Sequence, residues 1–130
     1  MLECKDVCFS YLKGKNTLDH ISCKIEEGSF VLLCGPSGCG KTSMTRLFNG
    51  LIPHYYEGEL KGSVTYKGKE IENLSLFDLS KVTGSVFQNP GSQFFNVDTT
   101  SELAFGPENH GLPEEKIHEN VQTPFIWKVF

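Results

Sequence analysis

The chain has 130 residues, which is enough for one modest domain with a single hydrophobic core. Its net charge is −4, and its basic residues are scattered, unlike the clustered Lys and Arg of nucleic-acid-binding proteins. We therefore expect no nucleic-acid partner. No segment approaches the roughly 18 apolar residues that cross a bilayer, and the N-terminus has no signal-peptide hydrophobic stretch. We expect a cytoplasmic chain that reaches a membrane only through a partner.

The first half of the chain contains the clearest periodic patterns. Residues 2–11 and 17–25 alternate between apolar and polar side chains, which predicts two half-buried strands in a hairpin. Residues 30–34 form a continuous apolar run, which is typical of a strand buried on both faces. A helical pattern follows over residues 41–49, and Gly50 is well placed to end that helix.

The second half is predicted to continue with alternating strands and helices. Residues 62–66 and 70–71 flank a Lys-Gly turn and indicate an antiparallel strand pair. Residues 74–81 suit a short helix, and residues 82–87 suit a further buried strand.

A loop over residues 88–97 comes next, and helix resumes near Thr100. Thr99 and Glu102 have the spacing of a capping box, and Asp98 is expected near the N-cap. A last helix is predicted to begin after Pro113.

The spacing of the cysteine and histidine residues in the sequence does not indicate a metal site. The five cysteines are odd in number and contain no CxxC pair, so neither a disulfide framework nor a zinc site is indicated. We expect reduced, mostly buried thiols. The four histidines are scattered and are interpreted as surface residues; they are His20, His54, His110 and His118.

The motif that carries chemistry is GPSGCGKT at residues 35–42, which matches G-x-x-x-x-G-K-[ST] between a predicted buried strand and a helix. Glycines allow backbone N–H groups to turn inward around an anion, and the helix directs its positive dipole end at the same point. Lys41 reaches the β- and γ-phosphates of a nucleotide, and the Thr42 hydroxyl can bind Mg²⁺. The simpler alternative, a glycine turn that caps a helix, would produce the bare pattern about once per hundred such chains.

The residues around this motif resemble those of ABC ATPases. Residues 35–43 look like their phosphate loop, in which a second hydroxyl residue, here Ser43, typically follows. Residues 9–11 (FSY) resemble the segment that supplies an aromatic platform for adenine, here Tyr11. The resemblance implies ATP and Mg²⁺ as cofactors. The implied nucleotide-binding residues are Tyr11, Gly35, Pro36, Ser37, Gly38, Cys39, Gly40, Lys41, Thr42 and Ser43.

A second matching segment is VFQNP at residues 86–90, which resembles the Q-loop of the same family. The family's glutamine, here Gln88, contacts Mg²⁺ and the attacking water, and its loop faces the transmembrane partner. The resemblance therefore implies a metal site made by Thr42 and Gln88.

Within that family the chain is most similar to energy-coupling-factor ATPases of bacterial vitamin and metal-ion importers. This similarity implies ATP binding that powers import, a transmembrane transporter subunit, a second ABC ATPase domain as a dimer partner, and a place at the inner face of the cell membrane. Gly91 departs from the pattern, because an acidic or amide residue is common there. The segments that carry the similarity are residues 49–54, 87–95, 102–109 and 111–113.

Several parts of the family's catalytic site are not found in these 130 residues. P-loop ATPases hold Mg²⁺ with an aspartate that ends a second buried strand, and the family adds a glutamate, an LSGGQ-like segment and a late histidine. Residues 94–98 (FFNVD) resemble such a strand only superficially, since Asn96 interrupts it and Thr99 follows in place of Glu. We expect the chain to be inactive alone, although the family hydrolyses ATP.

The predicted fold class is α/β: a P-loop NTPase core with an antiparallel β subdomain, the first half of an ABC nucleotide-binding domain. Residues 1–97 are assigned to this core and subdomain, residues 98–123 to the start of a helical subdomain, and residues 124–130 to an irregular apolar tail. A truncated or frameshifted reading frame is the simplest explanation of that ending.

Two alternatives stay open at the sequence level. One is an inactive fragment that only docks on a transporter partner. The other is a different P-loop enzyme, such as a small-molecule kinase, although a single arginine, Arg46, argues against an Arg-rich lid.

Overall fold

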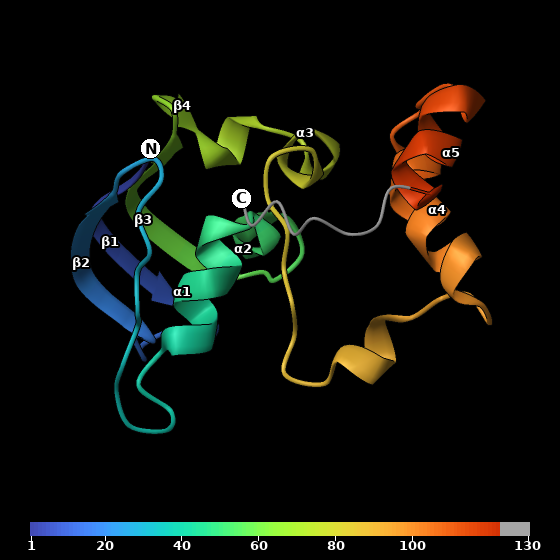
Figure 1. Cartoon of the computed structure of the whole chain (residues 1–130). Coiled ribbons are helices and arrows are strands. Elements are labelled where there is room, and N and C mark those ends of the chain that lie inside the picture. The colour runs from blue at the N-terminus through green and yellow to red at the C-terminus, as the bar shows by residue number, and fades with distance from the viewer. Residues whose placement is uncertain (123–130) are drawn as a thin grey trace. The chain divides into compact units, whose positions relative to one another are not determined.

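A computed structural model describes residues 1–122 of the protein, apart from the side chain of Pro90. The chain divides into two compact units, Met1–Gly84 and Ser85–Phe130, which are considered separately (Figure 1). The first unit contains a β-sheet with short helices, and the second contains the helices α4 and α5. The domain boundaries expected at residues 97 and 123 stay predictions. The apolar tail expected at residues 124–130 lies outside the described residues.

The sheet of the first unit has four antiparallel strands in the order β2-β1-β3-β4. Strands β1 and β2 form the predicted N-terminal hairpin, and β3 pairs with the other side of β1. The antiparallel β subdomain expected from the sequence is therefore confirmed. The strands are β1 Leu2–Ser10, β2 Leu18–Ile25, β3 Glu59–Tyr66 and β4 Lys69–Glu70.

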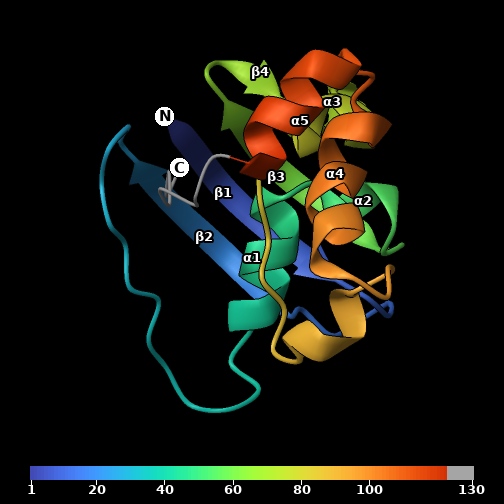
Figure 2. The ribbon, with the colours of Figure 1, turned by 45° about the vertical axis from the view of Figure 1, so that its right-hand side comes forward.

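Helix α1 (Lys41–Phe48) lies across one face of this sheet (Figure 2). Its Met44 and Leu47 join the buried side chains of β1 in the core. Gly50 follows the helix with a left-handed φ of 76°, and a Cβ there would collide with Leu79, so only glycine suits the position. Three shorter helices complete the unit: α2 Leu51–His54, η1 Ile71–Asn73 and α3 Leu76–Ser80.

Two predictions of buried strands are wrong. Within the described residues, neither residues 30–34 nor residues 82–87 form a strand, and Phe30 is 93% exposed and Val86 87% exposed. Figure 2 shows the segment between β2 and α1 extending away from the sheet. A strand buried on both faces needs neighbours for its backbone N–H and C=O groups. In residues 1–122 the strands pair only within the β2-β1-β3-β4 sheet. The apolar runs at residues 30–34 and 82–87 therefore have no paired strand beside them in the described part of the chain.

The second unit contains η2 (Pro90–Gln93), α4 (Thr99–Asn109) and α5 (Glu114–Gln122). Asp98 is the N-cap of α4, as expected, and its carboxylate accepts a hydrogen bond from the Ser101 backbone N–H at 2.8 Å. That bond and the Ser101 hydroxyl hold the pKa of the Asp98 carboxyl below its usual value. The predicted Thr99 capping box is wrong by one residue, and Glu102 instead accepts from the backbone of Phe95 at 3.0 Å.

The cysteines are all free, but the expectation that they are mostly buried is wrong. Cys34 and Cys39 are exposed, and only Cys4 is buried. The Cys4 thiol lies 3.4 Å from the Cys23 thiol across the β1–β2 pair. Burial, reinforced by Cys23, raises the pKa of the Cys4 thiol to about 12.

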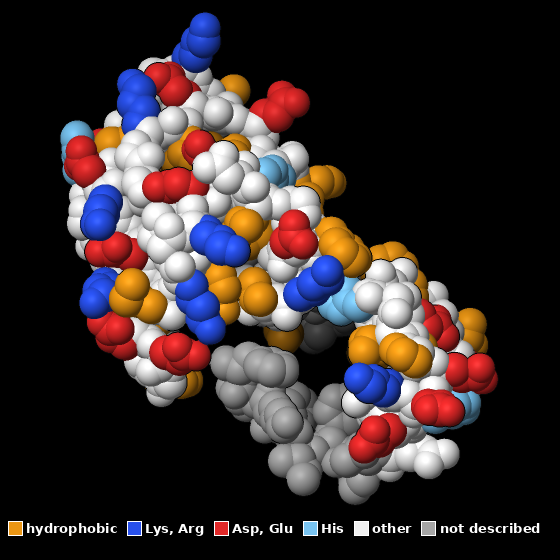
Figure 3. Space-filling model, turned by 90° about the horizontal axis from the view of Figure 1, so that it is seen from above, with side chains coloured by type: hydrophobic (Ala, Val, Ile, Leu, Met, Phe, Trp, Pro, Cys, Tyr) orange, Lys and Arg blue, Asp and Glu red, His pale blue; other side chains and the backbone are white. Residues whose placement is uncertain are grey.

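The described surface carries mixed charges. On the face shown in Figure 3, basic and acidic side chains are interspersed, with apolar side chains between them. None of the helices in residues 1–122 combines the length and the apolar character that a membrane span requires.

Candidate functional site

The glycine-rich loop at residues 35–40 leads directly into α1, as the motif requires, but the buried strand expected before the loop is not formed in the described residues. Gly38 and Gly40 have left-handed φ values of 80° and 95°, a region that side chains other than glycine rarely adopt. A Cβ at Gly40 would also lie 2.8 Å from the carbonyl oxygen of Thr17. This position therefore needs glycine both for its backbone angle and for the close approach of the chain before β2.

The Lys41 side chain folds back across the loop. Its Nζ donates hydrogen bonds to the carbonyl oxygens of Gly35 at 2.8 Å and of Pro36 at 2.7 Å, and it lies 3.6 Å from the Cys39 Sγ. The ammonium group is thus held against the loop by neutral carbonyl groups. A phosphate oxygen is a stronger partner for an ammonium group than a carbonyl, because both partners are charged.

The start of α1 suits an anion and its metal ion. Among the described residues, no side chain caps this helix N-terminus, and no acidic residue lies in its first turn. The positive end of the helix dipole is therefore not compensated there. Thr42 lies in the first turn of α1 and is exposed, whereas Ser43 is buried. The binding of a phosphate group here, with Mg²⁺ at Thr42, stays a prediction.

Tyr11, the expected adenine platform, lies just beyond β1 in a cluster of aromatic rings. Its ring meets Phe9 edge-on with centroids 4.7 Å apart, and its hydroxyl lies 3.1 Å from the Ser43 hydroxyl. The structure thus links the predicted adenine residue to the helix that follows the phosphate loop. Whether the ring stacks on a base stays a prediction.

Arg46 was not singled out as a site residue, yet it contacts two rings of this cluster. Its Nη1 donates to the Tyr11 hydroxyl at 3.1 Å, and its guanidinium lies 4.1 Å from the centre of the Tyr56 ring. Ser43 and Arg46 are three residues apart, so they share one face of α1. That spacing is the sequence signal that could have placed both residues beside Tyr11.

Gln88, the expected Q-loop residue, belongs to the second unit and is exposed there. Its proposed pairing with Thr42 around a metal ion stays a prediction. The loop that carries it is closed by Gln93, whose side chain accepts from the Phe87 N–H at 3.2 Å and donates to the Ser85 carbonyl at 3.3 Å. Sequence reasoning did not identify this contact, because it depends on the path of the loop.

Comparison with known proteins gives one family over most of the chain. The family model described as ABC transporter matches residues 18–126. A protein of Treponema denticola named as an ABC transporter ATP-binding protein is 52% identical over 118 residues, which cover 90% of this chain. Similarly named proteins of Methanosarcina acetivorans and Clostridium perfringens are 44% and 40% identical over 94% and 93% of the chain. The chain covers only 24%, 19% and 22% of the length of these three relatives.

Proposed function

This chain belongs to the ABC transporter family, and we propose that it is the Walker A portion of an ATPase that powers import through a membrane partner. The fold class is that of a P-loop NTPase with an antiparallel β subdomain. ATP-binding domains of this family bind ATP, generally with Mg²⁺. The proposal assigns this binding to the loop at residues 35–43 and to Tyr11.

The observation that carries the proposal is the position of Lys41 at the start of α1. Its ammonium group lies against the carbonyl groups of Gly35 and Pro36, where the helix dipole adds a second positive contribution. Bound Mg²⁺ would neutralise part of the phosphate charge, with Thr42 and Gln88 as its protein ligands. The chain's own residues bind and orient the phosphates.

The proposal also covers the transported substrate and the protein partners. The similarity at residues 87–95 and 102–109 supports an energy-coupling-factor type of importer for a vitamin or a metal ion. Such an ATPase works as a dimer of ABC domains at the inner face of the membrane, docked on a transmembrane subunit. The loop around Gln88 is the segment assigned to that subunit.

Competition between nucleotides tests the binding assignment. AMP lacks the β- and γ-phosphates that face Lys41, so we expect AMP to bind at least about tenfold more weakly than Mg-ATP. Calorimetric titration of the full chain with each nucleotide measures the difference. Equal affinities for AMP and Mg-ATP would mean that the loop does not hold the phosphates.

Turnover is expected to be absent from the chain on its own. The 130 residues contain no LSGGQ-like segment and no aspartate–glutamate pair after a buried strand, which the transition state needs for charge stabilisation and water positioning. A phosphate-release assay at saturating ATP should give the same rate for the chain and for its Lys41→Ala variant. Steady turnover that disappears in the variant would contradict this prediction.

A further inference from the structure

Three side chains with metal-binding atoms meet on the sheet of the first unit. They are Cys8 of β1 with Asp19 and His20 of β2, and one ligand atom of each lies within 4.8 Å of the others. Cys8 is half-buried between the buried neighbours Val7 and Phe9, and it points away from the core side of β1. The cluster is therefore open to solvent on the outer face of the sheet.

A β-bulge brings the three residues together. Val7 pairs with Ile21 and Phe9 with Leu18, so the single residue Cys8 faces two residues of β2, Asp19 and His20. Consecutive strand residues normally point to opposite faces of a sheet. His20 instead has a left-handed φ of 48°, and both Asp19 and His20 are exposed. The irregular backbone thus lets two consecutive residues of β2 lie beside the same residue of β1.

The distance between the sulfur and oxygen ligands is close to that of a tetrahedral zinc site, and the third ligand atom lies within 4.8 Å of both. With Zn–S about 2.3 Å and Zn–O about 2.0 Å, sulfur and oxygen ligands lie about 3.5 Å apart. The Cys8 Sγ and the Asp19 Oδ1 are 3.9 Å apart, so a small movement would bring both into contact with one ion. A thiolate, a carboxylate and an imidazole are the three ligand types that zinc accepts in proteins.

Neighbouring polar groups already hold two of the three ligands in place. The Asp6 Oδ1 lies 2.7 Å from the His20 Nδ1, and a proton on Nδ1 leaves the lone pair of Nε2 free for a metal. The Asn16 Nδ2 donates to the Asp19 Oδ1 at 2.7 Å. Such outer partners orient metal ligands and strengthen them.

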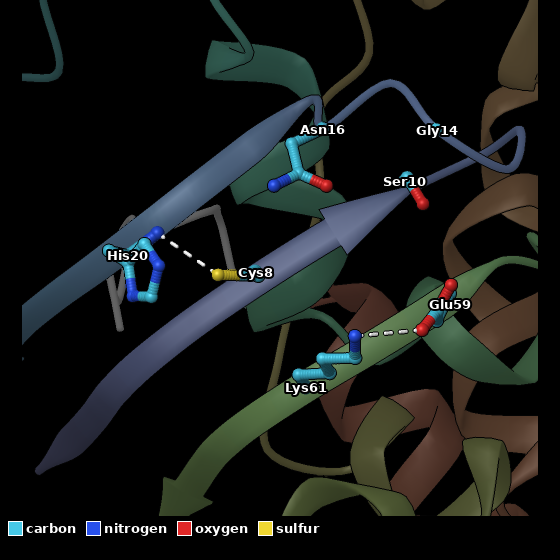
Figure 4. A pocket seen from close by; sticks show the side chains of 7 residues that line it. All are labelled: Cys8, Ser10, Gly14, Asn16, His20, Glu59 and Lys61. Carbon is cyan, nitrogen blue, oxygen red and sulfur yellow. Dashed lines mark hydrogen bonds and ion pairs between the residues drawn. The ribbon is translucent and has the colours of Figure 1, made fainter.

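A hollow of about 390 Å³ lies next to the cluster, with Cys8 and His20 in its wall (Figure 4). It leaves room for an ion and its water. The cation that lines it, Lys61, is paired with Glu59 at 2.9 Å, so its charge is compensated near the cluster. We propose that Cys8, Asp19 and His20 bind one Zn²⁺ ion, with water in the fourth position. The thiol proton of Cys8 passes to the solvent when the thiolate binds.

Metal titration of the full chain under reducing conditions tests the proposal. We expect one Zn²⁺ per chain by competition with a chromophoric chelator, and a thiolate-to-metal charge-transfer band when Co²⁺ replaces Zn²⁺. Cys8→Ser should remove that band. Cys8→Ser and His20→Gln should each weaken Zn²⁺ binding by more than about tenfold, because loss of a direct ligand lowers metal affinity at least as much as loss of an outer hydrogen-bond partner does. Asp6→Asn should weaken it by about tenfold through the His20 ring.

Matched controls separate this site from binding at other thiols and imidazoles. Cys34→Ser removes an exposed thiol elsewhere in the chain, and His118→Gln removes an exposed imidazole of the second unit. Both should leave the stoichiometry and the affinity unchanged. The proposal is overturned if Cys34→Ser weakens binding as much as Cys8→Ser, or if the chain binds no Zn²⁺. Because the His20 side chain is exposed, its replacement removes no buried packing. His20→Gln therefore still tests the proposal if Cys8→Ser disturbs folding.

Discussion

Replacing Lys41 with alanine is expected to weaken Mg-ATP binding by about 10- to 100-fold, whereas Lys13→Ala should leave it unchanged. A hydrogen bond to a charged group contributes about 1.5–3 kcal/mol, which corresponds to this range of dissociation constants. Lys41 lies in the loop against Gly35 and Pro36, and Lys13 is an exposed residue of the turn between β1 and β2. Calorimetric titration of the chain and both variants measures the effect.

The same experiment distinguishes lost phosphate contact from a disturbed loop. Lys41 also holds the loop carbonyl groups, so its removal can alter the loop itself. AMP binding should be nearly unchanged in Lys41→Ala, because the lysine is assigned to the β- and γ-phosphates. A parallel loss of AMP binding would indicate a disturbed loop, and equal Mg-ATP affinities for Lys41→Ala and Lys13→Ala would refute the assignment.

The purified chain is expected to be oligomeric, molten or insoluble when no partner subunit is present. Residues 30–34 expose a continuous apolar run without strand pairing in the described part of the chain, and Phe30 is 93% exposed. Unpaired backbone groups on an apolar segment are a template for association with another chain. Size-exclusion chromatography and a thermal melt measure the outcome. A soluble monomer with one sharp transition would contradict the prediction.

A pair of leucines with equal exposure identifies the segment responsible. Leu32 is 76% exposed within the apolar run, and Leu12 is 77% exposed in the turn after β1. Leu32→Asp should shift the chain toward the monomer, because a charge within the run opposes pairing. Leu12→Asp changes the net charge equally and should leave the association state unchanged. Equal effects of the two variants would point to net charge rather than to strand pairing.

The elements predicted best from the sequence are those that depend on nearby residues. The helix after the phosphate loop was expected over residues 41–49 and is observed at Lys41–Phe48. The cap at Asp98 was also expected, since a carboxylate before a helix binds its free N–H groups. The family was indicated by residues 35–43 and 86–90 and is confirmed by the match over residues 18–126.

The wrong strand predictions concern segments whose structure depends on hydrogen-bonding neighbours, and an apolar pattern does not identify such neighbours. Residues 30–34 and 82–87 have the composition of buried strands, but composition does not supply a hydrogen-bonding partner. The capping box was predicted one residue too late, because Asp98 and Thr99 are both suitable N-cap residues. In the structure the residue with extended backbone angles before α4 is Asp98.

The sequence by itself indicated the glycine-rich loop at residues 35–42, since the backbone angles of its glycines and the contacts of Lys41 are set within a few consecutive residues. Only the tertiary structure decided which distant groups meet. Arg46 meets the Tyr11 hydroxyl because α1 crosses the sheet, and Cys8 meets His20 because the β1–β2 register contains a bulge. Such contacts depend on the pairing of separate segments, and a shift of one residue in register would point the side chains to the other face of the sheet.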